Sequence, residues 1–362
     1  MLYIPYLFPL VAALIAAVVR GDISDYWFLY LIGVVACDLI IWIFYFFLTT
    51  CNEYLSGYVV KMVHENAWVE RVRTRETRTE NGKTVTETKI KYVHHPDKWY
   101  EVLNTGENIT VTSRFYDYYR NMWGGEYYIS VHHSNLESGG GGYEFKWNGD
   151  EGQSCTATYT GRYRNPLRNT NSIFRGTRMK RKMAKKIGLF DYPSVKDSEQ
   201  QVILRHEAVN CPDDFFMANV ALQRLNAFCG SKHQIHVFIL LFPADMGIGI
   251  SQQQYDYWKS LNKNELVVCL GIDDGKVKWT RAMCWGGEPK ELDILYRDYY
   301  ISDSRLRLTE FVYFMRDNID KWKRVEAKDF KYLGTHMSFG GGMLYLFISL
   351  ILSAVILYVA LS

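Results

Sequence analysis

Charged residues are almost absent from both ends of this 362-residue chain. Residues 1–50 contain one basic and three acidic residues, and residues 343–362 contain neither kind. The sequence also lacks low-complexity tracts and a collagen-like repeat, and its seven cysteines are far apart in the chain. These absences exclude disordered proteins, collagen-like fibres and small disulfide-stapled scaffolds.

Three apolar runs fill these poorly charged ends. Tyr3–Val19 carries no charge, Tyr26–Thr50 is interrupted only by Asp38, and Met343–Ser362 is uncharged throughout. A helix needs about 20 apolar residues to cross the hydrocarbon core of a bilayer. The sequence therefore predicts a transmembrane helical hairpin over residues 1–50 and a Gly-flanked transmembrane helix over residues 336–362, with the lipid bilayer as a partner.

The basic residues near the predicted spans indicate a topology. Arg20 alone lies between the first two runs, whereas five basic residues precede the third: Lys321, Lys323, Arg324, Lys328 and Lys331. The positive-inside rule then predicts an integral membrane protein with a cytoplasmic body and its C-terminus on the opposite face. Asp38 would be an intramembrane polar residue, either on an ion or proton path or as a neutral or hydrogen-bonded group that fixes helix packing or oligomer contacts.

A polar β-hairpin is predicted after the second run. Val69–Glu80 and Lys83–Val93 flank Asn81-Gly82, the strongest short signal for a hairpin turn. Because successive side chains in a strand point to opposite faces, Arg71, Arg73 and Arg75 share one face. Neither face is apolar enough to be buried. We therefore expect an exposed arm, either a solvated ribbon or a contact surface for another chain.

This arm belongs to a predicted β-rich domain over residues 51–195, which ends in a basic connector. Seven basic residues crowd that connector: Arg175, Arg178, Lys180, Arg181, Lys182, Lys185 and Lys186. Such a run can bind anionic lipid headgroups or nucleic acid phosphates, and a membrane-tethered domain without a base-reading module favours the headgroups. The alternative is a solvated connector with no ligand.

Residues 196–335 predict an α/β domain, so that the fold class is α+β. Helical spacing over Asp213–Phe228 precedes an apolar strand at Ile235–Phe242 and a helix at Gln252–Leu261. A second apolar strand at Leu266–Ile272, an Asp-Gly turn and a third strand follow, and then come two helices. Strands that alternate with helices are typical of a sheet covered by helices.

This order of elements resembles the TPM domain, which is known from photosystem-repair proteins and from membrane-anchored bacterial proteins. The segments that carry the resemblance are Gln234–Phe242, Asn262–Trp279 and Leu308–Trp322. The whole chain, including Asn171–Pro193, also resembles uncharacterised membrane proteins of tailed phages and large DNA viruses.

Two sets of residues are candidate metal ligands. The resemblance implies a divalent-cation site at Glu265, Asp273 and Asp274, but Asp-Asp-Gly is also a good turn sequence. The pairs His94-His95 and His132-His133 offer too few ligands to a single site for zinc. No resident cofactor is predicted beyond that divalent cation.

Three functions remain open at this point. The leading hypothesis is a non-enzymatic, membrane-anchored interaction or structural protein that binds a protein partner or a second copy of itself. The second is a TPM-type phosphoester hydrolase that uses Asp273 and Asp274 through a divalent cation. The third is a membrane tether that binds nucleic acid or anionic lipid through the basic connector.

Overall fold

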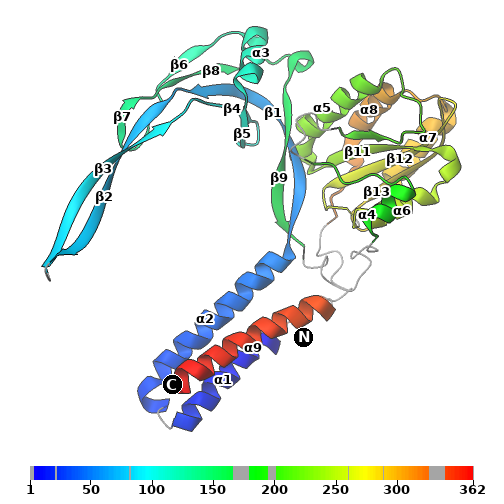
Figure 1. Cartoon of the computed structure of the whole chain (residues 1–362). Coiled ribbons are helices and arrows are strands. Elements are labelled where there is room, and N and C mark those ends of the chain that lie inside the picture. The colour runs from blue at the N-terminus through cyan, green and yellow to red at the C-terminus, as the bar shows by residue number, and fades with distance from the viewer. Residues whose placement is uncertain are drawn as a thin grey trace. The chain divides into compact units, whose positions relative to one another are not determined.

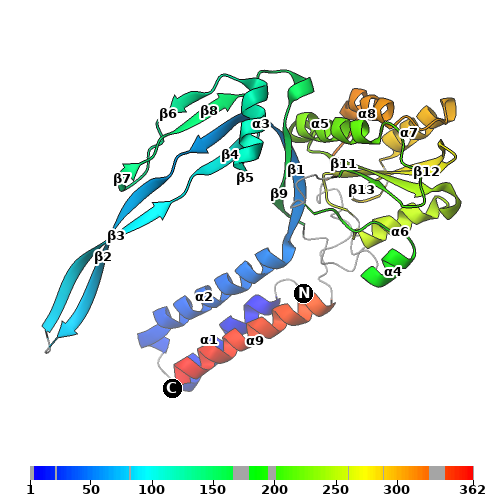
Figure 2. The same cartoon turned by 45° about the horizontal axis from the view of Figure 1, so that its top comes forward.

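A computed structural model describes residues 4–20, 23–80, 83–165, 179–194, 201–259, 261–287, 289–325 and 339–361. The architecture is α+β (Figures 1 and 2). The chain divides into two compact units. The first comprises Met1–Leu55, Tyr159–Leu222 and His233–Ser362, and the second comprises Ser56–Thr158 and Gln223–Lys232. The β-rich region predicted over 51–195 is thus shared between the two units.

The predicted membrane spans are wrong. Within the described ranges, no helix combines the length and the apolar character that crossing a bilayer requires. The transmembrane hairpin over residues 1–50, the transmembrane helix over 336–362 and the integral-membrane localisation derived from them are corrected accordingly. The apolar runs are helical, but α1 (Ile4–Arg20) has 17 residues, fewer than the roughly 20 that a span needs.

These helices pack on one another in the first unit. α1 contacts both α2 (Ile23–Thr49) and α9 (Phe339–Leu361), and α2 also contacts α9. The seam is lined by small side chains, because Ala12, Ala13, Ala16 and Ala17 of α1 are all buried. Small residues let helix axes approach closely. The other faces of the three helices keep large apolar side chains exposed, among them Leu14, Val18 and Phe47.

Asp38 lies in the middle of α2 and is half-buried. Its Oδ1 atom is buried and has no hydrogen-bond partner among the described residues. Burial raises the pKa of this carboxyl above its ordinary value. This shift favours the neutral form of the carboxyl, and the helix-packing interpretation of Asp38 stays a prediction.

The α/β part of the first unit is built on a four-stranded sheet in the order β10-β11-β12-β13. β10 (Ile203–Arg205), β11 (His236–Pro243) and β12 (Glu265–Asp273) are parallel, and β13 (Lys276–Cys284) is antiparallel to β12. Both central strands are almost continuously apolar and buried, because helices cover the two faces of the sheet.

Helices cover both faces of this sheet. They include α5 (Phe215–His233), α7 (Lys290–Ser302) and α8 (Leu308–Asp317), as well as α4 (Arg181–Lys186) and α6 (Gly249–Tyr257). In Figures 1 and 2, α5, α7 and α8 lie on one side of the sheet, and α4 and α6 lie on the other. Short 3₁₀ turns at Ala244–Met246 and Ile319–Lys321 complete this part.

The second unit is organised on β1 (Thr50–Glu65), a strand of 16 residues that continues from the first unit. The sheet has the order β5-β4-β1-β8-β6, and β9 (Thr156–Arg164) also pairs with β1. The other strands are β4 (Lys98–Leu103), β5 (Asn108–Val111), β6 (Tyr127–Ile129) and β8 (Gly142–Lys146). α3 (Ser113–Trp123) is capped by the Thr112 side chain, which accepts a hydrogen bond from the Phe115 amide at 3.3 Å. A 3₁₀ turn follows at Glu151–Gln153.

A second, three-stranded sheet of this unit forms the predicted arm, in the order β3-β2-β7. β2 (Trp68–Glu80) and β3 (Lys83–His95) pair in register over 13 residue pairs. β7 (Leu136–Gly139) pairs only with Trp68, Val69 and Glu70 at the base. Beyond this base, β2 and β3 continue as a two-stranded ribbon (Figure 1).

Candidate functional site

The three predicted carboxylate ligands do not come together. Glu265 is the first residue of β12 and Asp273 is the last. Eight steps along an extended strand place their Cα atoms roughly 26 Å apart. Among the described residues, no group of three His, Cys, Asp or Glu side chains is arranged to hold a metal ion.

Asp274 and Gly275 form a tight turn between β12 and β13. Asp273 pairs directly with Lys276, so that the loop contains two residues, and both have positive φ, 47° and 67°. This conformation is the type I′ turn for which Asp-Gly is a preferred sequence. The Asp273 carboxylate is 63% exposed and lies 3.5 Å from the ammonium group of Lys278. Turn geometry therefore explains the Asp-Asp-Gly sequence.

An acidic cavity of about 1180 Å³ lies beside this turn, at the carboxyl ends of β11 and β12. This edge of an open α/β sheet is where ligands commonly bind. The acidic residues that line it are Asp213, Asp214, Asp245, Asp273, Asp274 and Glu310. One of them has a structural role, because the Asp214 carboxylate accepts a hydrogen bond from the Thr309 amide in the first turn of α8, at 2.7 Å.

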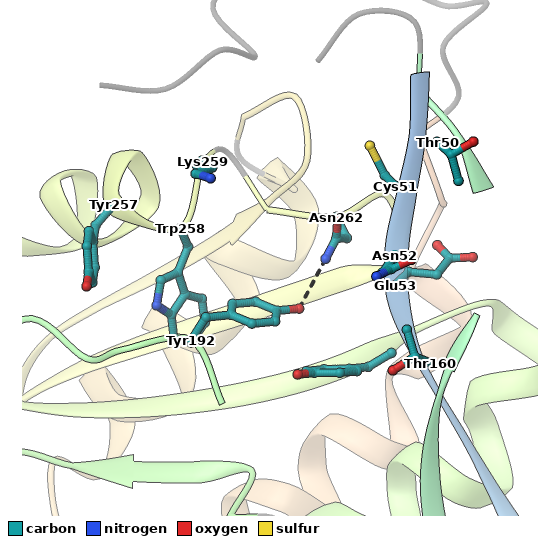
Figure 3. A pocket seen from close by; sticks show the side chains of 11 residues that line it. Thr50, Cys51, Asn52, Glu53, Thr160, Tyr192, Tyr257, Trp258, Lys259 and Asn262 are labelled. Atoms are coloured by element: carbon teal, nitrogen blue, oxygen red, sulfur yellow. Dashed lines mark hydrogen bonds between the residues drawn. The ribbon is translucent and has the colours of Figure 1, made fainter. Parts of the chain in front are cut away.

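A second cavity, of about 540 Å³, opens at the other end of the strands (Figure 3). Tyr192, Tyr257 and Trp258 line one side of it, and residues 50–53 at the start of β1 line the other. The remaining lining residues are Tyr54, Thr160, Lys259 and Asn262. The size and the mixture of aromatic and polar groups are those of a small-molecule pocket.

Glu265 lies beneath this cavity and is fully buried. Its Oε2 accepts a hydrogen bond from the Asn262 amide at 2.8 Å, and its Oε1 accepts one from the Asn262 side chain at 2.7 Å. The Tyr192 hydroxyl also donates to Oε1 and accepts from Asn262 Nδ2 at 3.1 Å, the contact dashed in Figure 3. Burial and this carboxylate raise the pKa of Tyr192 well above its ordinary value.

His236 and Tyr54 belong to the same buried layer. The Tyr54 ring stacks on Tyr192 at 5.3 Å and meets the His236 ring edge-on at 5.8 Å. His236 is fully buried at the start of β11, and burial lowers its pKa to about 3. Burial thus favours the neutral imidazole of His236 in this layer.

At the rim of the cavity, the buried carboxylate of Glu53 forms an ion pair with Arg324 at 2.9 Å. Burial raises the pKa of Glu53, and the guanidinium of Arg324 opposes that rise. Glu53 and Glu265 are thus both held by neighbouring donors. This arrangement stabilises the fold around the cavity.

The basic connector is described only in part, since Arg175 and Arg178 lie outside the described residues. Arg181 is paired with Asp191 at 2.7 Å, which raises the pKa of Arg181. Lys180, Lys182, Lys185 and Lys186 are exposed, and so is Arg181. Its predicted binding to anionic headgroups or nucleic acid stays a prediction.

Two of the paired histidines have a structural role at the base of the ribbon. The Trp68 indole is stacked between His95, at 4.1 Å, and His133, at 3.9 Å. His95 also contacts the Glu70 carboxylate at 3.1 Å. The neighbouring residues His94 and His132 are exposed. These contacts anchor the ribbon on β7 and the loop before it.

Much of the ribbon itself is open to solvent, since residues 73–75 and 88–92 are exposed. Its register places Arg71 opposite Tyr92 and Arg73 opposite Ile90, all on the face that also carries Arg75. Tyr92 is 50% exposed and Ile90 is 45% exposed. We refer to these five residues as the arginine face.

Sequence reasoning missed the Tyr192–Asn262–Glu265 network and the role of β7. A signal for the network existed, because Asn262, Asn264 and Glu265 are polar residues placed immediately before an apolar strand. Comparison with protein families, with curated proteins and with solved structures finds no match for this chain. The TPM and viral resemblances therefore stay predictions.

Proposed function

We propose that this chain is a non-enzymatic interaction protein and that the β2–β3 ribbon is its contact surface. The observation that carries the proposal is the unequal pairing of the ribbon. β2 pairs with β3 along its whole length, but β7 covers only three residues of its other edge. Exposed strand edges present unpaired N–H and C=O groups and readily pair with another chain.

The composition of the ribbon supports the same function. The described side chains from residue 73 to 75 and from 88 to 92 are all exposed, so that this part of the ribbon adds nothing to a core. A two-stranded ribbon is only marginally stable by itself. A partner that covers an edge or a face of the ribbon would stabilise it.

The hydrolase hypothesis has weaker support. It requires carboxylates that share a cation, yet Asp273 and Asp274 form a turn and Glu265 lies at the far end of β12. Incubation of the full chain with a generic phosphoester and magnesium or manganese should therefore give no turnover above that of Asp273→Asn/Asp274→Asn.

Photo-crosslinking tests the contact surface. We expect p-benzoylphenylalanine in place of Tyr92 to give a discrete protein adduct when cells that produce the full chain are irradiated, because this ring lies on the arginine face. Tyr313 of α8 is the matched control, since it is 51% exposed against 50% for Tyr92. Adducts are detected as mass-shifted bands on a denaturing gel. Absence of an adduct at Tyr92, or an equal yield at Tyr313, would refute the proposed function.

A further inference from the structure

The arginine face carries an excess of positive charge. Residues 68–75 and 88–95 contain one acidic residue, Glu70, and the register places it on the opposite face. Arg73 and Arg75 are exposed and form no ion pair within the described residues. Two arginines and two exposed apolar side chains, Ile90 and Tyr92, are therefore open to a partner.

The backbone of the same arginines is also open. Arg71 donates its N–H to the Asn135 carbonyl at 2.9 Å, which shows that this amide points away from β3. Because N–H groups alternate between the two edges of a strand, the amides of Arg73 and Arg75 point to the same edge. No described strand covers that edge beyond Glu70. Arg73 and Arg75 thus each direct a backbone N–H group toward this edge and also carry a positive side chain.

β7 shows how this edge is recognised. It runs antiparallel to β2 over three residues, and its Glu137 places a carboxylate 3.7 Å from the Arg71 guanidinium. An acidic residue on an added strand therefore already pairs with the first arginine of the series. The next two arginines have no such neighbour in the described structure.

We propose that the β2 edge binds an acidic polypeptide segment in extended conformation, which continues the line of β7 along Arg73 and Arg75. Side chains on one face of a strand repeat at about 6.8 Å. A segment with acidic residues at alternate positions would match both arginines. This inference rests on the proposed function and assigns a chemistry to the partner.

Strand addition favours a polypeptide over a nucleic acid. A phosphate backbone would neutralise the two guanidinium groups but has no peptide groups to pair with a strand edge. A peptide supplies both kinds of contact, as β7 does for Arg71. Nucleic acid binding therefore becomes an outcome of the test.

The probe is a fluorescein-labelled peptide of alternating Glu and Val residues, measured by fluorescence anisotropy with the full chain in 150 mM salt. We expect saturable binding, and we expect Arg73→Glu/Arg75→Glu to raise Kd by at least about tenfold. Lys89→Glu/Lys91→Glu makes the same change of charge on the opposite face and should alter Kd by less than about threefold. A Lys–Val peptide should bind Arg73→Glu/Arg75→Glu more tightly than it binds the wild type, which shows that the variant keeps its fold.

Three results would overturn the inference: no saturable binding of the Glu–Val peptide, an equal loss of affinity in both double variants, or tighter binding of an oligothymidylate that depends on the same two arginines. The crosslink at Tyr92 distinguishes a failure of this inference from a failure of the proposed function. If the crosslink forms but the peptide does not bind, the ribbon contacts a protein of different chemistry. If neither occurs, both proposals fail.

Discussion

Replacement of Glu265 by alanine is expected to lower the free energy of unfolding by about 3–5 kcal/mol. The substitution removes the shared acceptor of two Asn262 donors and the Tyr192 hydroxyl, and it leaves the buried Asn262 without this carboxylate. A buried donor without a partner costs about 1–3 kcal/mol. Urea-induced unfolding of the full chain, followed by circular dichroism and tryptophan fluorescence, measures the change.

Asp273→Ala is the matched control, because it removes a carboxylate at the other end of the same strand. The Asp273 side chain is 63% exposed, so we expect a change within about 0.5 kcal/mol. Equal effects of the two substitutions would contradict the structural role given to Glu265. A loss of less than about 1 kcal/mol in Glu265→Ala would also contradict it.

Acidification is expected to destabilise the α/β part of the first unit through His236. The pKa of this imidazole is about 3 in the folded chain, against an ordinary value of 6.5. Between these values the unfolded chain binds a proton that the folded chain does not, so the free energy of unfolding falls as the pH falls. The slope reaches about 1.4 kcal/mol per pH unit, which amounts to about 2 kcal/mol between pH 6.5 and pH 5 and about 4 kcal/mol by pH 3.

His236→Phe isolates this contribution. The aromatic ring keeps contacts to Tyr54 and Phe238 but cannot titrate. Other groups titrate in the same range; the buried carboxyl of Glu101, for example, has a pKa raised to about 7 by burial and destabilises the fold as the pH rises. The free energy of unfolding of the wild type, minus that of the variant, should therefore fall by about 2 kcal/mol from pH 7 to pH 5. Parallel pH profiles of the two proteins would show that His236 does not cause the effect.

The sequence predicted the α/β elements well, because their signals are local. The apolar strand expected at Ile235–Phe242 is β11 (His236–Pro243), and the helix expected at Asp213–Phe228 is α5 (Phe215–His233). The Asp-Gly turn was likewise readable from two residues. β10 was missed because it has three residues and is recognised only by its pairing with β11.

The prediction of membrane spans at the apolar ends was wrong for a different reason. Apolar runs predicted helices, and α1, α2 and α9 lie in those runs. Hydropathy does not encode what a helix packs against, and the alanines of α1 contribute to a seam between helices. The assignment of these helices as membrane spans went beyond what that signal supports.

Among the candidate sites, the sequence predicted which arginines share a face of the ribbon. Side chains of a strand alternate between its two faces, and the two-residue turn fixes the register of the hairpin. The sequence did not predict β7, whose four residues Leu136–Gly139 have no strand pattern of their own. Glu265 was grouped with Asp273 because they are near in sequence. In an extended strand, however, the first and the last of nine residues lie as far apart as the chain allows.

Residue-resolved hydrogen exchange of β2, with electron-transfer fragmentation, tests the claim of strand addition most directly. In the free chain, the amides of Arg73 and Arg75 should exchange fast, whereas those of Val72 and Thr74, which point toward β3, should be slower. With saturating Glu–Val peptide, the exchange of Arg73 and Arg75 should slow by at least about tenfold, as for amides that enter a β ladder. Unchanged exchange at these two amides in the presence of bound peptide would contradict the binding of a strand at this edge.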